Sequence, residues 1–143
     1  MNHLSQSTPY DAFSQDYDRF VNWPGRLAVE MPFLESWLKA SRATHILDAA
    51  CGTGMHAIAL AKLGLQVSGA DLSPAMIERA RHNALHSGVA VDFQPARFGQ
   101  LSSTFSTGSF DAILCLGTSL PHLLTSAELS AALVDFAACL KPG

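Results

Sequence analysis

Two acidic residues and a pair of glycines are the residues of this 143-residue chain whose types and spacing could do chemistry. Asp48 lies four residues before Gly52, and Gly54 follows after one further residue. Glycines permit backbone angles and a close ligand approach that a Cβ would block. A carboxylate beside such a loop would repel a pyrophosphate, but it could pair with an ammonium group. Asp71, which follows the next apolar run, is placed to accept both hydroxyls of a ribose; its alternative role is to cap the next helix.

The glycines lie in the turn between a predicted strand and a predicted helix. Ile46, Leu47, Ala49 and Ala50 are apolar, as in a parallel strand that is buried on both faces. Met55 to Leu63 have a helix-forming composition, and Gly64 stands where a helix-ending glycine is expected. The turn therefore directs backbone N–H groups and the positive end of a helix toward a ligand that is polar or anionic.

Strands and helices alternate along the rest of the chain. The further elements that we expect are a strand at Leu65–Ala70, a helix at Ala75–Ser87 capped by Ser73 and Pro74, a strand at Val89–Phe93, a loop at Leu101–Ser109, a strand at Phe110–Leu116 and a helix from Thr125 to about Leu140. Such alternation predicts an α/β fold, a doubly wound parallel sheet in the order 3-2-1-4 with helices on both faces. The ligand crevice would lie at the carboxyl ends of strands one and four.

Residues 1–44 are predicted to form a helical cap or lid before a ligand-binding core at residues 45–143. Thr8 to Trp23 would be a helix with aromatic side chains at helical spacing, namely Tyr10, Phe13, Tyr17 and Phe20. These rings either pack as an ordinary apolar stripe or cover a cationic group at the site. A second helix is expected from Leu27 to Arg42, with a break or a late start near Met31, because Pro32 lies inside it.

Three motifs together resemble class I S-adenosylmethionine-dependent methyltransferases, a Rossmann-like family, and in particular the small-molecule type of the glycine/sarcosine N-methyltransferases. They are Asp48-x-x-x-Gly52-x-Gly54, Asp71-Leu72-Ser73-Pro74-Ala75-Met76 and Leu116-Gly117-Thr118-Ser119-Leu120-Pro121-His122-Leu123. Tyr17-Asp18 with Trp23 and Arg26 is similar to the N-terminal segment of these enzymes. A domain of this family normally continues through three further strands, so the sequence is expected to be truncated at its C-terminal end.

The resemblance implies S-adenosylmethionine as cofactor and methyl transfer to a small acceptor, most simply an amine, by in-line displacement. It implies that the cofactor contacts Tyr17, Arg26, Asp48, Ala50, Gly52, Gly54, Asp71, Leu72, Met76, Arg97, Phe98, Leu116 and Gly117. Tyr17, Ser119 and His122 would face the acceptor. No acid or base is expected to be essential, because alignment of the reactants alone can supply up to ~7–11 kcal/mol.

Some of these residues have other interpretations. Leu72 and Met76 would flank an adenine ring or fill the core, and His122 would position a loop or act as a base. Arg97 stands where the family commonly has an aspartate that accepts from the adenine amino group, and an arginine cannot accept a hydrogen bond. His82 and His86 have the spacing of two metal ligands, but no third ligand is evident, so a solvated helix face is expected and no metal.

Composition excludes some function classes. The net charge of −3, with scattered basic residues, indicates no nucleic-acid partner, and no apolar stretch has the length of a membrane helix. Three cysteines in such a chain are typical of reduced thiols, so we expect a cytoplasmic protein. Two alternatives stay open: an NAD(P)-binding oxidoreductase domain, which also has glycines in this pattern, and a cofactor-binding fragment without catalysis of its own. The oligomeric state is open too.

Overall fold

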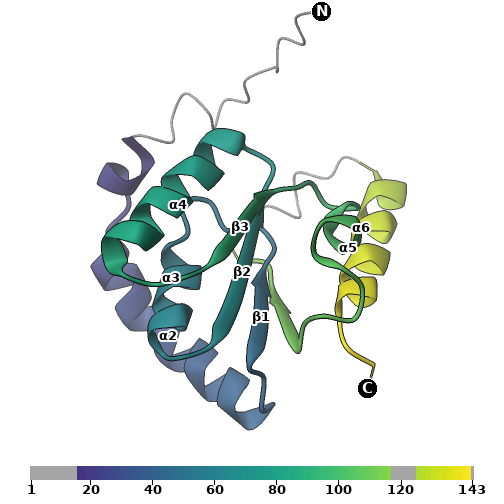
Figure 1. Cartoon of the computed structure of the whole chain (residues 1–143), viewed down its shortest axis with the longest axis horizontal. Helices are drawn as coiled ribbons and strands as arrows, with labels where there is room; N and C mark the ends of the chain where they lie inside the picture. Colours follow the sequence, from purple (N-terminus) through teal and green to yellow (C-terminus); the bar gives the residue numbers. More distant parts are fainter. Residues whose placement is uncertain (1–15, 117–124, 143) are drawn as a thin grey trace, which may run out of the picture.

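The computed structural model describes residues 16–116 and 125–142, and its centre is a four-stranded sheet in the order β3-β2-β1-β4 (Figure 1). The strands are β1 (His45–Asp48), β2 (Gln66–Asp71), β3 (Asp92–Pro95) and β4 (Ala112–Leu114). Each neighbouring pair is parallel. The predicted α/β fold and the predicted strand order are therefore confirmed.

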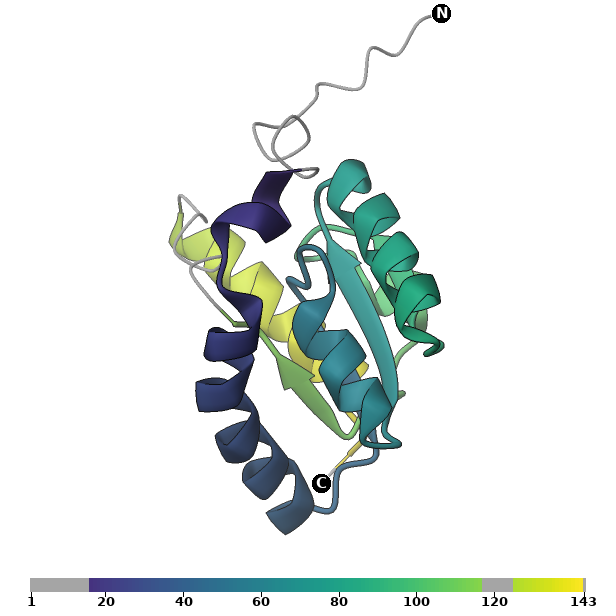
Figure 2. The ribbon, with the colours of Figure 1, turned by 90° about the vertical axis from the view of Figure 1, so that its left-hand side faces the viewer.

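Helices cover both faces of the sheet (Figures 1 and 2). One face carries α2 (Trp23–Ala40), α3 (Met55–Lys62) and α4 (Pro74–Ser87), and the other carries α5 (Leu101–Phe105) and α6 (Ser126–Cys139). Strand β1 separates two apolar clusters: Ile46 packs with Leu38 of α2, and Leu47 packs with Phe110 and Cys139. Ile46 and Leu47 are both fully buried, as expected for a central parallel strand.

Local signals set the helix ends as the sequence predicts. The Ser73 hydroxyl accepts from the Met76 N–H at the start of α4, and the Thr125 hydroxyl accepts from the Glu128 N–H at the start of α6. Residues 16–20 form a short helix at the end of the molecule where the carboxyl ends of the strands lie (Figure 2). Among the described residues, no helix has both the length and the hydropathy needed to cross a membrane.

The predicted start and break of the second helix are wrong. Helix α2 begins at Trp23, where Asn22 caps it by accepting from the Gly25 N–H, and it runs unbroken past Pro32 to Ala40. Trp23 therefore opens α2 and does not end the preceding helix. A proline inside a helix removes one hydrogen bond, and this loss is outweighed here by the burial of Leu34 and Leu38 in the core.

Two further predictions around β3 are wrong. The strand lies at Asp92–Pro95 and not at Val89–Phe93, because the Val89 N–H donates to Ala84 at the end of α4 and cannot pair in the sheet. The predicted loop at Leu101–Ser109 contains the helix α5. Strand β4 is shorter than predicted, and Phe110 before it forms an isolated bridge with Leu140.

Candidate functional site

The turn after β1 is held at the carboxyl edge of the sheet by backbone hydrogen bonds to both neighbouring strands. The Ala49 N–H donates to Leu114 of β4, and the Cys51 N–H donates to Ala70 of β2, each at 2.8 Å. The Gly54 N–H then closes the turn onto the Cys51 carbonyl at 2.9 Å. We call residues 49–54 the glycine loop. Its position between β4 and β2 is the switch point at which doubly wound sheets bind ligands.

The two glycines of this loop serve different needs. Both have a positive φ, +54° at Gly52 and +84° at Gly54. A Cβ on Gly54 would lie 2.7 Å from the Phe93 ring, so this glycine lets the loop pack closely on the interior. A Cβ on Gly52 would meet no atom within 4 Å, so this glycine faces open space, where a ligand can approach the backbone.

Asp71 ends β2 and touches the glycine loop. Its Oδ2 accepts from the Gly52 N–H and its Oδ1 accepts from the Ser73 N–H, both at 3.0 Å. These two bonds fix the orientation of the carboxylate beside the glycine loop. The structure thus gives Asp71 a cap-like contact with Ser73, and it places the same carboxylate beside Gly52.

Asp48 ends β1 as a buried carboxylate, with 1% of its surface exposed. Its Oδ1 has no hydrogen-bond partner among the residues that the structure describes. Burial raises the pKa of the Asp48 carboxyl to about 7; the N–H of Ala50 partly offsets this and the charge of Asp71 adds to it. A buried and unsatisfied carboxylate is costly, and a cationic ligand group would remove that cost.

The other predicted cofactor residues lie along the same edge with different exposure. Leu72 is exposed after β2, whereas Met76 is buried in α4. Arg97 is exposed after β3, and the half-buried Phe98 packs edge-on against Phe136 of α6, with ring centroids 5.4 Å apart. Ala50 and Leu116 are half-buried. Gly117, and the predicted acceptor contacts Ser119 and His122, lie outside the described residues.

A second cluster lies where the N-terminal segment meets α2 and α3. Arg26 stacks its guanidinium 5.2 Å from the Trp23 ring and donates to Glu30 at 2.8 Å. The other oxygen of Glu30 contacts the buried His56 imidazole of α3. Burial alone would raise the pKa of Glu30, but the hydrogen bonds from Arg26 and His56 outweigh it and hold that pKa below its ordinary value. The Tyr17 ring lies 6.2 Å from Trp23, so two of the predicted residues, Tyr17 and Arg26, flank one indole.

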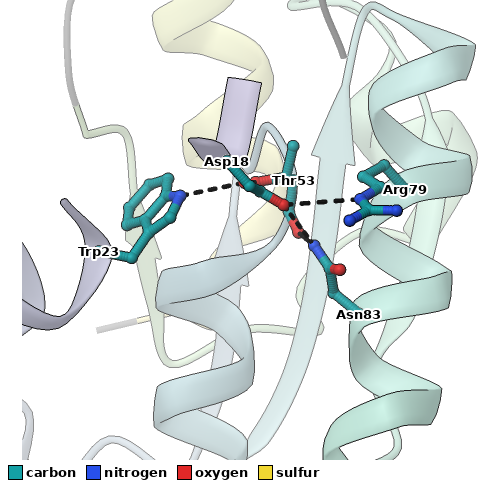
Figure 3. A network of polar contacts seen from close by, with 5 residues as sticks. All are labelled: Asp18, Trp23, Thr53, Arg79 and Asn83. Atoms are coloured by element: carbon teal, nitrogen blue, oxygen red, sulfur yellow. Dashed lines mark hydrogen bonds and ion pairs between the residues drawn. The ribbon is translucent and has the colours of Figure 1, made fainter. Parts of the chain in front are cut away.

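Sequence reasoning missed a carboxylate that joins the N-terminal segment to the glycine loop. Asp18 accepts from the Trp23 indole, from the Thr53 hydroxyl and from the Asn83 amide, and it pairs with Arg79 (Figure 3). Trp23 is five residues from Asp18, but Thr53, Asn83 and Arg79 lie 35 to 65 residues away, and no local pattern points to them.

His82 and His86 are both exposed on α4, and their rings stack with centroids 5.8 Å apart. In the described part of the chain, no group of three or more His, Cys, Asp or Glu side chains is arranged to hold a metal ion.

The sequence profile of a family described as the methyltransferase domain matches residues 46–143. The chain belongs to this methyltransferase domain family. It is 36% identical to the glycine/sarcosine N-methyltransferase of Parasynechococcus marenigrum, over 98% of this chain and 49% of that enzyme. It is also similar to the ubiquinone biosynthesis O-methyltransferase of Xanthomonas axonopodis, at 34% identity over 80% of this chain and 46% of that enzyme.

Among solved structures, this methyltransferase domain resembles CalS10, an amino pentose methyltransferase of Micromonospora echinaspora solved with S-adenosylmethionine bound. The TM-score is 0.67 at 31% identity, over 92% of this chain and 52% of that one. The chain thus spans about half the length of the relatives that it matches. The family and these relatives are methyltransferases, so the comparisons give the oxidoreductase alternative no support.

Proposed function

We propose that this chain binds S-adenosylmethionine at the glycine loop and forms the cofactor-binding part of a methyltransferase with a small-molecule amine as acceptor. The observation that carries the proposal is Asp48, whose buried Oδ1 has no hydrogen-bond partner among the described residues. An ammonium group such as that of the methionine moiety would supply the missing donor and the missing charge. Similarity to glycine/sarcosine N-methyltransferases supports the amine as acceptor.

Each side chain would have a defined task in this function. Asp71, already oriented by the N–H groups of Gly52 and Ser73, would accept from the ribose hydroxyls. Arg26, which is held by Glu30 and stacks on the Trp23 ring, would face the cofactor's carboxylate together with Tyr17.

When bound, the cofactor supplies an electrophilic sulfonium methyl group, and the chain's own residues align it and exclude water. Alignment of this kind is worth up to ~7–11 kcal/mol, so no essential acid or base is needed. Ser119 and His122, which lie outside the described residues, stay predictions as acceptor contacts. The assignments of Leu72, Met76, Arg97, Phe98 and Gly117 to the cofactor also stay predictions.

We also propose a cytoplasmic location and no nucleic-acid partner. Cys51, Cys115 and Cys139 are all free thiols, which suits a reducing compartment. The net charge of −3 favours no binding to a phosphate backbone.

Calorimetric titration with S-adenosylhomocysteine, with NADH as the competing ligand, tests the proposal. We expect micromolar binding of the former, and at least a thirtyfold loss in Asp71→Ala, which corresponds to about 2 kcal/mol for two charge-assisted bonds. The matched control is Asp92→Asn, because this exposed carboxylate lies at the opposite end of the strands. Preferential NADH binding, or no binding of S-adenosylhomocysteine by a folded chain, would overturn the proposal.

A further inference from the structure

The carboxylate of Asp18 gathers donors from three other parts of the fold (Figure 3). Its Oδ1 accepts from the Trp23 indole N–H at 3.0 Å and from the Thr53 hydroxyl at 2.5 Å. Its Oδ2 accepts from the Asn83 amide at 3.0 Å and lies 3.6 Å from Arg79 Nε. Trp23 begins α2, Thr53 belongs to the glycine loop, and Asn83 and Arg79 lie on α4.

Asp18, Trp23 and Thr53 are shielded from solvent, whereas the Arg79 side chain is 37% exposed. The Asp18 side chain is 13% exposed, Trp23 is 8% exposed and Thr53 is 1% exposed. Without the carboxylate, an indole N–H, a hydroxyl and an amide would lose their common acceptor in a region that water reaches poorly. A surface ion pair on the same helix, between Asp16 and Arg19, offers no such shielding, because both side chains are more than half exposed.

The contact with Thr53 connects this network to the candidate cofactor site. Thr53 lies between Gly52, whose N–H donates to Asp71, and Gly54, which is the N-cap residue of α3. Asn83 donates to the Thr53 carbonyl as well, at 3.0 Å, so the same residue is held through its side chain and its backbone.

On the other side, Tyr17 directly precedes Asp18, and its ring lies 6.2 Å from that of Trp23. Fixing Asp18 therefore fixes Tyr17 relative to the loop.

We propose that Asp18 is a positioning residue that holds residues 16–22 against the glycine loop, so that the loop and Tyr17 adopt their cofactor-binding arrangement together. We call this connection the latch. This inference rests on the proposed function and names a residue that acts through Thr53 and Tyr17. It predicts that the latched arrangement is already populated in the free chain. A ligand that needs this arrangement binds more weakly in proportion to the fraction of molecules that lack it.

The experiment compares Asp18→Ala with Asp16→Ala, which removes the same charge from the same short helix without touching the network. A Trp37→Phe background leaves Trp23 as the reporter, since Trp23 and Trp37 are the only tryptophans of the chain. Titration with S-adenosylhomocysteine should show at least a tenfold weaker affinity for Asp18→Ala and an unchanged affinity for Asp16→Ala. In the free chain, Asp18→Ala should shift the Trp23 emission to longer wavelength and increase amide exchange in residues 16–22.

Thr53→Val and Thr53→Ser keep the test decisive if Asp18→Ala does not fold. Valine replaces only the hydroxyl, so Thr53→Val should weaken ligand binding. Where Asp18→Ala folds, adding Thr53→Val to it should weaken binding little further. Serine keeps the hydroxyl and should bind like the unmodified chain. This rescue separates positioning from a purely structural role, because serine loses the methyl group but keeps the hydrogen bond, whereas valine keeps the methyl group but loses the hydrogen bond.

The possible outcomes distinguish the latch from the proposed function. If the unmodified chain binds S-adenosylhomocysteine and both Asp18→Ala and Thr53→Val bind within twofold of it, the latch is refuted and the proposed function stands. If the unmodified, folded chain does not bind, the proposed function fails, and the role of Asp18 in cofactor binding fails with it. Weaker binding in Asp18→Ala and Thr53→Val, with normal binding in Asp16→Ala and Thr53→Ser, supports both.

Discussion

The buried carboxylate of Asp48 makes a prediction about the stability of the ligand-free chain. Its Oδ1 has no partner among the described residues, and burial, with a contribution from Asp71, raises its pKa from an ordinary 3.8 to about 7. Replacing it in Asp48→Asn keeps the shape of the side chain but removes the ability to ionise. We therefore expect the variant to be more stable than the unmodified chain at neutral and alkaline pH, although it loses the proposed ligand.

The sign follows from proton linkage. Between pH 4 and 7 the folded chain keeps the Asp48 proton, whereas the unfolded chain has lost it, so the free energy of unfolding falls as the pH rises through this window. A pKa rise of about three units corresponds to about 4 kcal/mol once both states are ionised. Linkage places about 2.5 kcal/mol of that change between pH 5 and pH 8. Asp48→Asn cannot show this change.

Urea unfolding at pH 5, 6, 7 and 8 measures the effect. The stability difference between Asp48→Asn and the unmodified chain should widen by about 2.5 kcal/mol from pH 5 to pH 8. Asp92→Asn serves as the control for the substitution itself, because this carboxylate is exposed at the start of β3. A constant difference for Asp48→Asn, or one that narrows as the pH rises, would refute the reasoning.

The affinity for the ligand should also depend on the protonation of Asp48. If an ammonium group pairs with Asp48, the carboxyl must lose its proton on binding, so affinity for S-adenosylhomocysteine should increase with pH and level off above about pH 7. Below that pH, binding should release a proton, which calorimetry in buffers of different ionisation enthalpy detects. Binding without proton release at pH 6 would show that the ligand does not meet Asp48.

Three further predictions concern the loop and the frame around it. Gly54→Ala should lower the free energy of unfolding in urea by about 2–4 kcal/mol, because a φ of +84° is strained for alanine and the new Cβ would lie 2.7 Å from Phe93. As the contrasting loop variant, Gly52→Ala should lower it by only about 1–2 kcal/mol, yet it should weaken S-adenosylhomocysteine binding more than Gly54→Ala does. Asp135→Ala, which removes a buried acceptor of four hydrogen bonds, should cost about 2–4 kcal/mol in the same assay. Asp111 accepts from two backbone N–H groups, which hold its pKa below the ordinary range, so Asp111→Asn should lower the melting temperature at pH 7, and this difference should shrink as the pH falls below about 4.

Sequence reasoning succeeded where neighbouring residues determine the structure. The run from Ile46 through Gly54 into α3 could be predicted because an apolar strand, a glycine turn and a helix start each have local signals. The caps at Ser73 and Thr125 are local as well. Parallel connections then fix which strand ends share an edge, so Asp48 and Asp71 were brought together correctly.

The failures have non-local causes. Helix α5 forms because Asp135, on α6, accepts from its first N–H groups, and the sequence near Leu101 carries no sign of this partner. The Asp18 network depends on contacts with α4 across 65 residues. A proline inside a helix pattern predicts a break by a local rule, but the burial of Leu34 and Leu38 in the core stabilises α2 across Pro32.

The hydrogen bonds of Asp135 bear on Arg97, which stands where similar enzymes commonly have an acceptor for the adenine amino group. Asp135 is the carboxylate that the structure places against this loop, but it accepts from the N–H groups of Gly99, Leu101 and Ser102 and from the Ser102 hydroxyl. Four bonds fill the lone-pair sites of a carboxylate, so Asp135 has no capacity left for adenine. Through these bonds Asp135 fixes the backbone of the loop at residues 99–102, and it does not replace the acceptor that Arg97 lacks.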